Sequence, residues 1–257
     1  MTLANHLCTA AILALMVSRT TGGALIDQQY VPATTNSHGI VGASQQVHTA
    51  QTFTVGANGI LVGFDMWVTR HENVSEPLLF DIRRAQSGVP VNADSGPDIL
   101  ASGVLPADLI GISKPFDPPP GLSIGSRFID LDGPHLAPDA LVHINLSDTR
   151  FSVFQGEVLA IVLRSDEPNL FRGFTYVWHG HSPGEYQGGA GAFRSTADHK
   201  WYALENVGSL SSDHAFRTYV QPITEPRTAM LLIAGVLMVL NHTFKKRSRY
   251  TSLGPLI

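Results

Sequence analysis

The sequence carries little charge, and its charged residues are widely spread. Only 15% of the 257 residues are Asp, Glu, Lys or Arg, and the formal net charge is −4, whereas ordinary soluble domains have about 25% charged residues. Lys and Arg are scattered except near the C-terminus. Because the chain lacks the cluster of positive charge that binds the phosphate groups of nucleic acids, we expect no nucleic-acid partner.

Cysteine is almost absent, since Cys8 is the one cysteine in the chain. It lies in the apolar stretch 7–17, which has the length of a signal-peptide core, about 7 to 15 residues. Small residues precede Leu25 and predict cleavage there, so 1–24 is interpreted as a signal peptide, although 1–6 has no Lys or Arg. The alternative is a buried N-terminal helix. If cleavage occurs, the mature chain is exported without disulfides.

Long helical patterns are also missing from 25–221, which we interpret as one domain. Apolar residues alternate there instead, as at Ile60, Val62, Phe64, Met66 and Val68, and this period predicts one face of a strand. Similar short runs occur at 78–82, 127–131, 141–146, 157–163, 174–178 and 214–220. With 24 Gly and 16 Pro spread between them, the runs predict an all-β antiparallel sandwich or barrel.

Aromatic and histidine side chains are densest at 174–202. The candidates for a ligand site there are Trp178, His181, Glu185, Tyr186, Gln187 and Trp201. The three rings lie on or beside glycine-rich loops, where flat faces can stack on sugars, and the polar residues can bond sugar hydroxyls. Alternatively, the two tryptophans are core residues that close one end of the sandwich.

Motifs for catalysis and metal binding are incomplete. Ser123 lies in a G-x-S-x-G pattern, but a proline run precedes it and a strand-like run follows, whereas a nucleophile elbow joins a strand to a helix. We therefore expect no catalytic residue, and keep a secreted hydrolase of polysaccharides or esters as an alternative. A zinc site needs three or four ligands. The donors that could join His179 and His181 are Glu185, Asp198 and His199.

Calcium is the remaining candidate ion, and no cofactor is expected otherwise. Asp130, within the DLDG run at 130–133, and Asp213 could supply oxygen ligands. The spaced acidic loop of an EF-hand is absent from the sequence. A structural calcium ion is therefore left open.

The C-terminal region combines a short motif, an apolar run and a basic cluster. Thr224, Glu225 and Pro226 precede the apolar run 228–244, which is marginal as a membrane span because a spanning helix needs about 20 residues. The cations that follow are Lys245, Lys246, Arg247 and Arg249. Their position predicts that they stay in the cytoplasm while the body lies outside.

This order resembles the PEP-CTERM sorting signal of exported proteins in Gram-negative bacteria. The resemblance implies that 222–249 holds the protein in the inner membrane until an exosortase, a membrane-embedded cysteine protease-transpeptidase, acts at the Pro-Glu-Pro step. Glu225 and Pro226 match this motif, whereas Thr224 replaces its first proline and the tail 250–257 extends beyond the cations. Both departures bear on processing more than on membrane retention.

The body also resembles a jelly-roll module found in exported bacterial proteins with such tails. The resemblance lies in 50–68, 158–165, 176–180, 184–193 and 213–220. It implies a jelly-roll-like sandwich of a kind that often binds carbohydrate and in some cases structural calcium. We therefore expect an exported, non-enzymatic protein of the cell surface or biofilm matrix, with polysaccharide as the candidate partner. A purely structural matrix protein is a further alternative, which predicts that all three aromatic rings are buried.

Overall fold

The computed structural model describes residues 23–33, 35, 37–41, 48–92, 96–112, 140–165, 176–195, 198–204 and 212–223. The chain divides into two compact units, 1–222 and 223–257, and all the strands belong to the first. Ser123, Asp130 and residues 1–22 of the predicted signal peptide lie outside the described residues, as does the sorting segment from Thr224 onward.

No helix in the described ranges is both long enough and apolar enough to cross a membrane.

The described elements are almost all strands. They are β1 (Leu25–Tyr30), β2 (Ser37–Val41), β3 (His48–Thr54), β4 (Gly59–Arg70), β5 (Leu78–Gln86), β6 (Val89–Pro90), β7 (Ile99–Leu105), β8 (Leu141–Asn145), β9 (Ser152–Val153), β10 (Val158–Arg164), β11 (Tyr176–His181), β12 (Gly191–Arg194), β13 (Trp201–Ala203), β14 (Asp213–His214) and β15 (Phe216–Pro222). One short 3-10 helix, η1 (Ala107–Leu109), follows β7.

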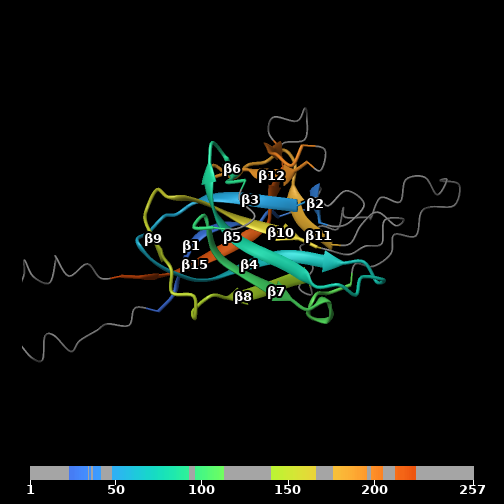
Figure 1. The fold of residues 1–257 in the computed structure, drawn as a ribbon, viewed down its shortest axis with the longest axis horizontal. Coiled ribbons are helices and arrows are strands. Elements are labelled where there is room, and N and C mark those ends of the chain that lie inside the picture. The colour runs from blue at the N-terminus through green and yellow to red at the C-terminus, as the bar shows by residue number, and fades with distance from the viewer. Residues whose placement is uncertain are drawn as a thin grey trace, which may run out of the picture. The chain divides into compact units, whose positions relative to one another are not determined.

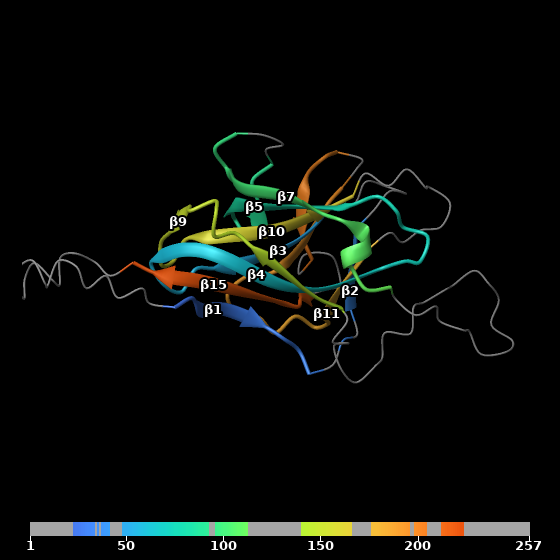
Figure 2. The same cartoon turned by 90° about the horizontal axis from the view of Figure 1, so that it is seen from below.

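The strands form two antiparallel sheets that pack face to face. The eight-stranded sheet has the order β1-β15-β4-β11-β14, with β2 beside β11 and with β8 and β9 beside β4. The seven-stranded sheet has the order β13-β12-β3-β10-β5-β6, with β7 beside β5. Figure 2 shows β1, β15 and β4 in one layer and β3, β10, β5 and β7 in the other, and Figure 1 shows the same strands from the broad side. The predicted all-β antiparallel sandwich is confirmed.

The core lies between the sheets and is built by alternation along their central strands. On β4, Phe64, Met66 and Val68 are fully buried, and on β10 Leu159 and Ile161 face them from the other sheet. Alternate residues of a strand point to opposite faces, so the residues between them face outward. Burying each large apolar side chain stabilises the fold by about 1.5 to 3 kcal/mol.

The predicted buried face of β4 is correct in the C-terminal part of the strand and wrong at its N-terminal end. Leu61 is fully buried, whereas Ile60 and Val62 are partly exposed. The cause is a bulge in the pairing of β4 with β15, where Tyr219 is opposite Gly63 but the next residue, Val220, is opposite Leu61. An extra residue in one strand shifts the alternation from that point onward.

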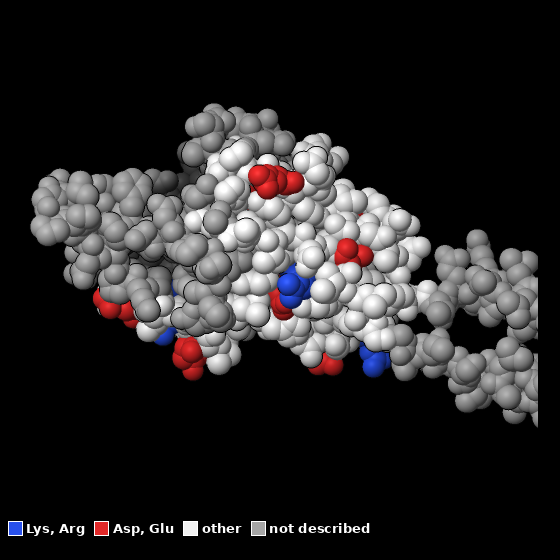
Figure 3. All heavy atoms as spheres, turned by 180° about the vertical axis from the view of Figure 1, so that it is seen from behind, with Lys and Arg blue, Asp and Glu red and all other residues white. Residues whose placement is uncertain are grey.

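Charged side chains are sparse on the face seen in Figure 3. Most are separated there by uncharged surface, and near the middle a basic group adjoins an acidic one. The described part of this face therefore presents no continuous patch of one sign.

Candidate functional site

Trp178 lies in the core, so the prediction that it forms part of an exposed ligand face is wrong. Its side chain is 0% exposed. Its indole Nε1 donates to the Ala215 carbonyl at 2.9 Å, and its ring stacks on His214 with centroids 4.9 Å apart. A ring enclosed in this way has no free face for a sugar. The alternative prediction, that Trp178 is a core residue, is therefore correct.

Trp201 is also buried, at 8% exposed, but on the outer face of the seven-stranded sheet. It packs there against Ala50, Ala160 and Ala192 on three neighbouring strands. The small side chains leave room for the indole, which covers them. Trp201 is therefore a packing residue, and the prediction that its ring is an exposed stacking face is wrong too.

Asp213 brings two of the other candidates, Glu185 and Tyr186, into one cluster. The Tyr186 backbone N–H donates to Asp213 Oδ2 at 2.9 Å, and Gln51 Nε2 donates to Oδ1 at 3.2 Å. Burial raises the pKa of Asp213, while the hydrogen bonds from Tyr186, Gln51 and backbone N–H groups act in the opposite direction. Since Gln51 belongs to one sheet and Asp213 to the other, this carboxylate joins the two sheets.

Tyr186 packs inward from this cluster and does not face solvent freely. Its ring meets Phe216 edge-on at 5.2 Å and lies 6.1 Å from the ring of Tyr30. Its hydroxyl donates to Gln28 Oε1 at 3.0 Å. Burial raises the pKa of Tyr186, and raises the pKa of Tyr30 to about 12 together with the charges of Asp213 and Glu185. Both hydroxyls therefore remain protonated at neutral pH.

The predicted ligand residues other than Gln187, five in all, do not form one face. His181 is partly buried and lies opposite Asp213 in the strand register, and Glu185 is exposed. These two lie near Tyr186, because all three border Asp213. Trp178 and Trp201 lie apart from them, in the core and on the outer face of the other sheet.

The predicted zinc site would need a third ligand beside His179 and His181. Within the described ranges, no three His, Cys, Asp or Glu side chains are placed to hold a metal ion. His179 Nε2 lies instead 3.1 Å from the Thr69 hydroxyl. Asp213, one of the two calcium candidates, has both carboxylate oxygens engaged by hydrogen-bond donors.

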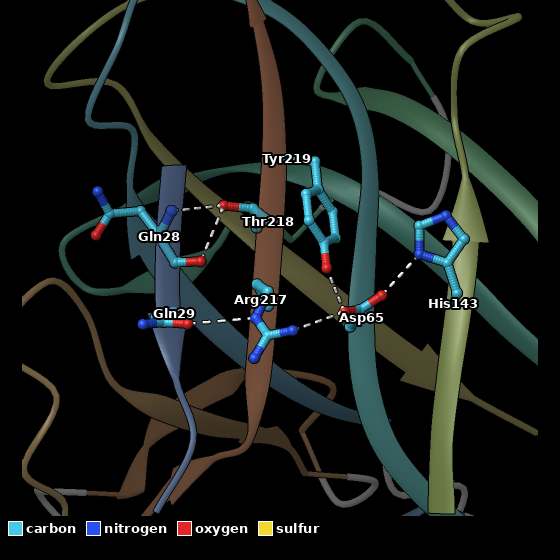
Figure 4. A network of polar contacts seen from close by, with 7 residues as sticks. All are labelled: Gln28, Gln29, Asp65, His143, Arg217, Thr218 and Tyr219. Carbon is cyan, nitrogen blue, oxygen red and sulfur yellow. Dashed lines mark hydrogen bonds and ion pairs between the residues drawn. The ribbon is translucent and has the colours of Figure 1, made fainter. Parts of the chain in front are cut away.

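A row of polar side chains crosses four neighbouring strands on the outer face of the eight-stranded sheet. Gln29 on β1, Arg217 on β15, Asp65 on β4 and His143 on β8 form this outer-face row (Figure 4). Each residue is opposite the next in the strand registers. The antiparallel pairing therefore aligns four side chains that are far apart in the sequence.

Asp65 is the centre of the outer-face row. His143 Nδ1 lies 2.7 Å from Asp65 Oδ1, and the Tyr219 hydroxyl donates to Oδ2 at 2.6 Å. Arg217 donates to Asp65 Oδ2 at 3.5 Å and through Nε to Gln29 Oε1 at 3.2 Å. Because a carboxylate only accepts hydrogen bonds, a hydrogen lies on His143 Nδ1. In the neutral form of the ring, Nε2 is then an acceptor.

The outer-face row is buried at Asp65 and more exposed on either side of it. The Asp65 side chain is 6% exposed, against 59% for His143 and 28% for Arg217. The guanidinium of Arg217 lies over the Trp67 ring at 5.7 Å, a cation–π contact that orients it. Burial, together with the hydrogen bond to Asp65, raises the pKa of Tyr219, so its hydroxyl stays a donor.

The sequence contains a partial signal for this row. Asp65 alternates with the core residues Phe64 and Met66, and Arg217 follows the core residue Phe216. Alternation therefore marks Asp65 and Arg217 as outward-facing. It does not show that their strands are neighbours, and sequence reasoning missed the row for that reason.

Comparisons with known proteins identify no family. No protein-family profile matches the sequence, and no curated protein matches it. Among solved structures, the chain is similar to the crystal structure of the cysteine protease and lectin-like domains of Cwp84, a surface layer associated protein of Clostridium difficile. The match is 11% identical, covers 69% of this chain and 32% of that chain, and has a TM-score of 0.42. The chain thus spans about a third of that protein's length, and a similarity at this level assigns neither family nor function.

Proposed function

We propose that this chain is an exported, non-enzymatic protein of the cell surface or extracellular matrix that binds polysaccharide through the outer-face row. The observation that supports the proposal is the placement of Gln29, Arg217, Asp65 and His143 side by side on an outer sheet face. The buried Asp65 carboxylate holds the two more exposed partners in fixed orientations. Preorganised polar groups lose little conformational freedom on binding.

The chemistry of the row suits hydroxyl groups. In its neutral form His143 can accept a hydrogen bond at Nε2. The guanidinium of Arg217 has five N–H groups, more than the contacts with Gln29 and Asp65 use. A pair of neighbouring sugar hydroxyls can donate to the first and accept from the second. Since the charges of Asp65 and Arg217 balance, the row favours a neutral polyol over a phosphate.

Export and membrane retention are part of the same proposal. Cleavage before Leu25 would release the mature N-terminus, and 222–249 would hold the body at the outer side of the inner membrane. An exosortase would then act at Thr224-Glu225-Pro226. The support is the order of motif, apolar run and basic cluster in the sequence.

A purely structural matrix role is the second candidate. It predicts that the rings of Trp178, Tyr186 and Trp201 are all buried. The two tryptophans are buried, and Tyr186 is partly so. The two candidates differ in whether the folded chain binds a polysaccharide.

Co-sedimentation of the full chain with insoluble cellulose, chitin and xylan tests the proposal. We expect the wild type to sediment with at least one of them, and Arg217→Ala and His143→Ala to lose about tenfold or more in affinity, as expected for residues central to an interface. His71→Ala, a histidine outside the row, is the matched control and should bind as the wild type does. A folded wild-type chain that binds none of these polymers would refute the binding proposal in favour of a structural role.

A further inference from the structure

A pair of stacked aromatic rings lies on the β12–β13 hairpin, at the edge of the seven-stranded sheet. Phe193 on β12 is opposite Tyr202 on β13, and their rings stack with centroids 5.7 Å apart and an interplanar angle of 25°. The Tyr202 side chain is 40% exposed. Because β13 is the last strand in the sheet order, this pair lies at the periphery of the sandwich.

Tyr202 points away from the buried tryptophan beside it. Successive side chains of a strand alternate between faces, so Tyr202 and Trp201 lie on opposite sides of β13. Trp201 covers the small residues of the outer face, whereas Tyr202 remains accessible. Among the described rings of 174–202, the exposed one is therefore Tyr202, the neighbour of the predicted candidate Trp201.

The turn of the hairpin holds Tyr202 in place. The Tyr202 hydroxyl donates to Asp198 Oδ2 at 2.5 Å, and the Lys200 backbone N–H donates to Asp198 Oδ1 at 3.2 Å. Across the turn, Arg194 Nε donates to the His199 carbonyl at 3.1 Å. The hydrogen bond between Tyr202 and Asp198 lowers the pKa of Asp198 and raises the pKa of Tyr202. The pair therefore stays as an ionised carboxylate and a protonated phenol at neutral pH.

We propose that Tyr202, backed by Phe193 and flanked by Asp198 and Lys200, is a second sugar-binding subsite that stacks on the apolar C–H face of a pyranose with equatorial hydroxyls. This inference rests on the proposed function and names the ligand class. A flat, half-exposed ring with a fixed hydroxyl offers an apolar face beside a polar handle. At its rim, Asp198 can accept from ring hydroxyls, and the exposed Lys200 can donate to them.

The charges at this subsite point to the same ligand class. Asp198 and Lys200 carry opposite charges beside one another, so the rim has no net preference for an ion. A neutral ring with hydroxyls around its edge satisfies both groups, while its C–H face covers the phenol. A β-linked glucan presents such faces along its length.

Isothermal titration of the full chain with cellohexaose tests the inference. We expect the wild type to bind, Tyr202→Ala to weaken binding about tenfold or more as a central aromatic contact, and Tyr202→Phe to stay within about threefold because the ring is kept. Phe154→Ala is the matched control, since Phe154 is another exposed aromatic, at 64%, in the turn between β9 and β10. It should bind as the wild type does. Thermal melting of each variant shows whether it is folded.

Nitration with tetranitromethane locates the contact directly. We expect cellohexaose to protect Tyr202 from nitration, as mapped by mass spectrometry of the digested chain. Unchanged binding by folded Tyr202→Ala, or nitration of Tyr202 unaffected by the sugar, would overturn the subsite and leave the proposed function standing. A wild type that binds other polysaccharides but not cellohexaose would overturn the ligand class. A wild type that binds no polysaccharide would refute the proposed function itself.

Discussion

Replacing Asp213 with Ala should destabilise the sandwich by removing an acceptor that both sheets use. Asp213 is 4% exposed and accepts from Gln51 Nε2 and from the Tyr186 backbone N–H. Each buried donor left without a partner costs about 1 to 3 kcal/mol. The substitution also removes the cost of burying an ionised carboxylate, so we expect a net loss of about 2 to 4 kcal/mol, a large share of the ~5 to 15 kcal/mol that stabilise a typical domain.

Urea unfolding at neutral pH, followed by the fluorescence of the buried Trp178, measures this loss. The matched control is Asp108→Ala, at an exposed carboxylate in η1, which should change the free energy of unfolding by no more than about 0.5 kcal/mol. An Asp213→Ala chain as stable as Asp108→Ala would refute the view that this carboxylate joins the sheets.

The stability difference between wild type and Asp213→Ala should also depend on pH in a defined direction. Burial raises the pKa of Asp213 above its ordinary value of 3.8, against the effect of its hydrogen bonds. A carboxyl whose pKa is higher in the folded chain stabilises the fold fully below its unfolded pKa and loses that contribution as the pH rises through the folded value. The advantage of the wild type over the variant should therefore grow as the pH falls from about 7 towards 4. A difference that narrows on acidification would contradict the raised pKa.

Two further predictions concern Trp178 and the C-terminal segment. Trp178→Ala should cost about 3 to 5 kcal/mol in the free energy of unfolding, because the ring is fully buried; an unfolding curve like that of the wild type would contradict its place in the core. A fusion of 222–257 to an exported reporter should retain the reporter in the membrane fraction, and Asp at Leu231, Leu232 and Val236 should release it. If the reporter fused to unaltered 222–257 stays soluble, this segment is not a membrane anchor.

The sequence predicted the fold class because strand periodicity is a local property. Alternation placed Phe64, Met66 and Val68 on one face, and the structure buries all three. It failed at Ile60 and Val62, because a bulge depends on how two strands pair and not on either strand alone. At Gly63 an added Cβ would lie 2.7 Å from the Ile144 carbonyl on β8, a close approach that is visible only once β8 is in place.

The candidate sites were predicted less well, since exposure depends on neighbours distant in the chain. The aromatic density of 174–202 suggested stacking by Trp178 and Trp201, but Trp178 is covered by His214 and Trp201 rests on three alanines. Tyr202 escapes this covering because it points to the other side of an edge strand. Residue type alone does not distinguish these environments.

By itself, the sequence determined the all-β class, the outward position of Asp65 and Arg217, and the order of motif, apolar run and cations at the C-terminus. Each of these follows from composition or from spacing between near neighbours. Only the tertiary structure decided that Asp65 lies beside His143, 78 residues away, and beside Arg217, 152 residues away. Strand order and register arise from packing the two sheets over one core, and that packing is a property of the whole chain.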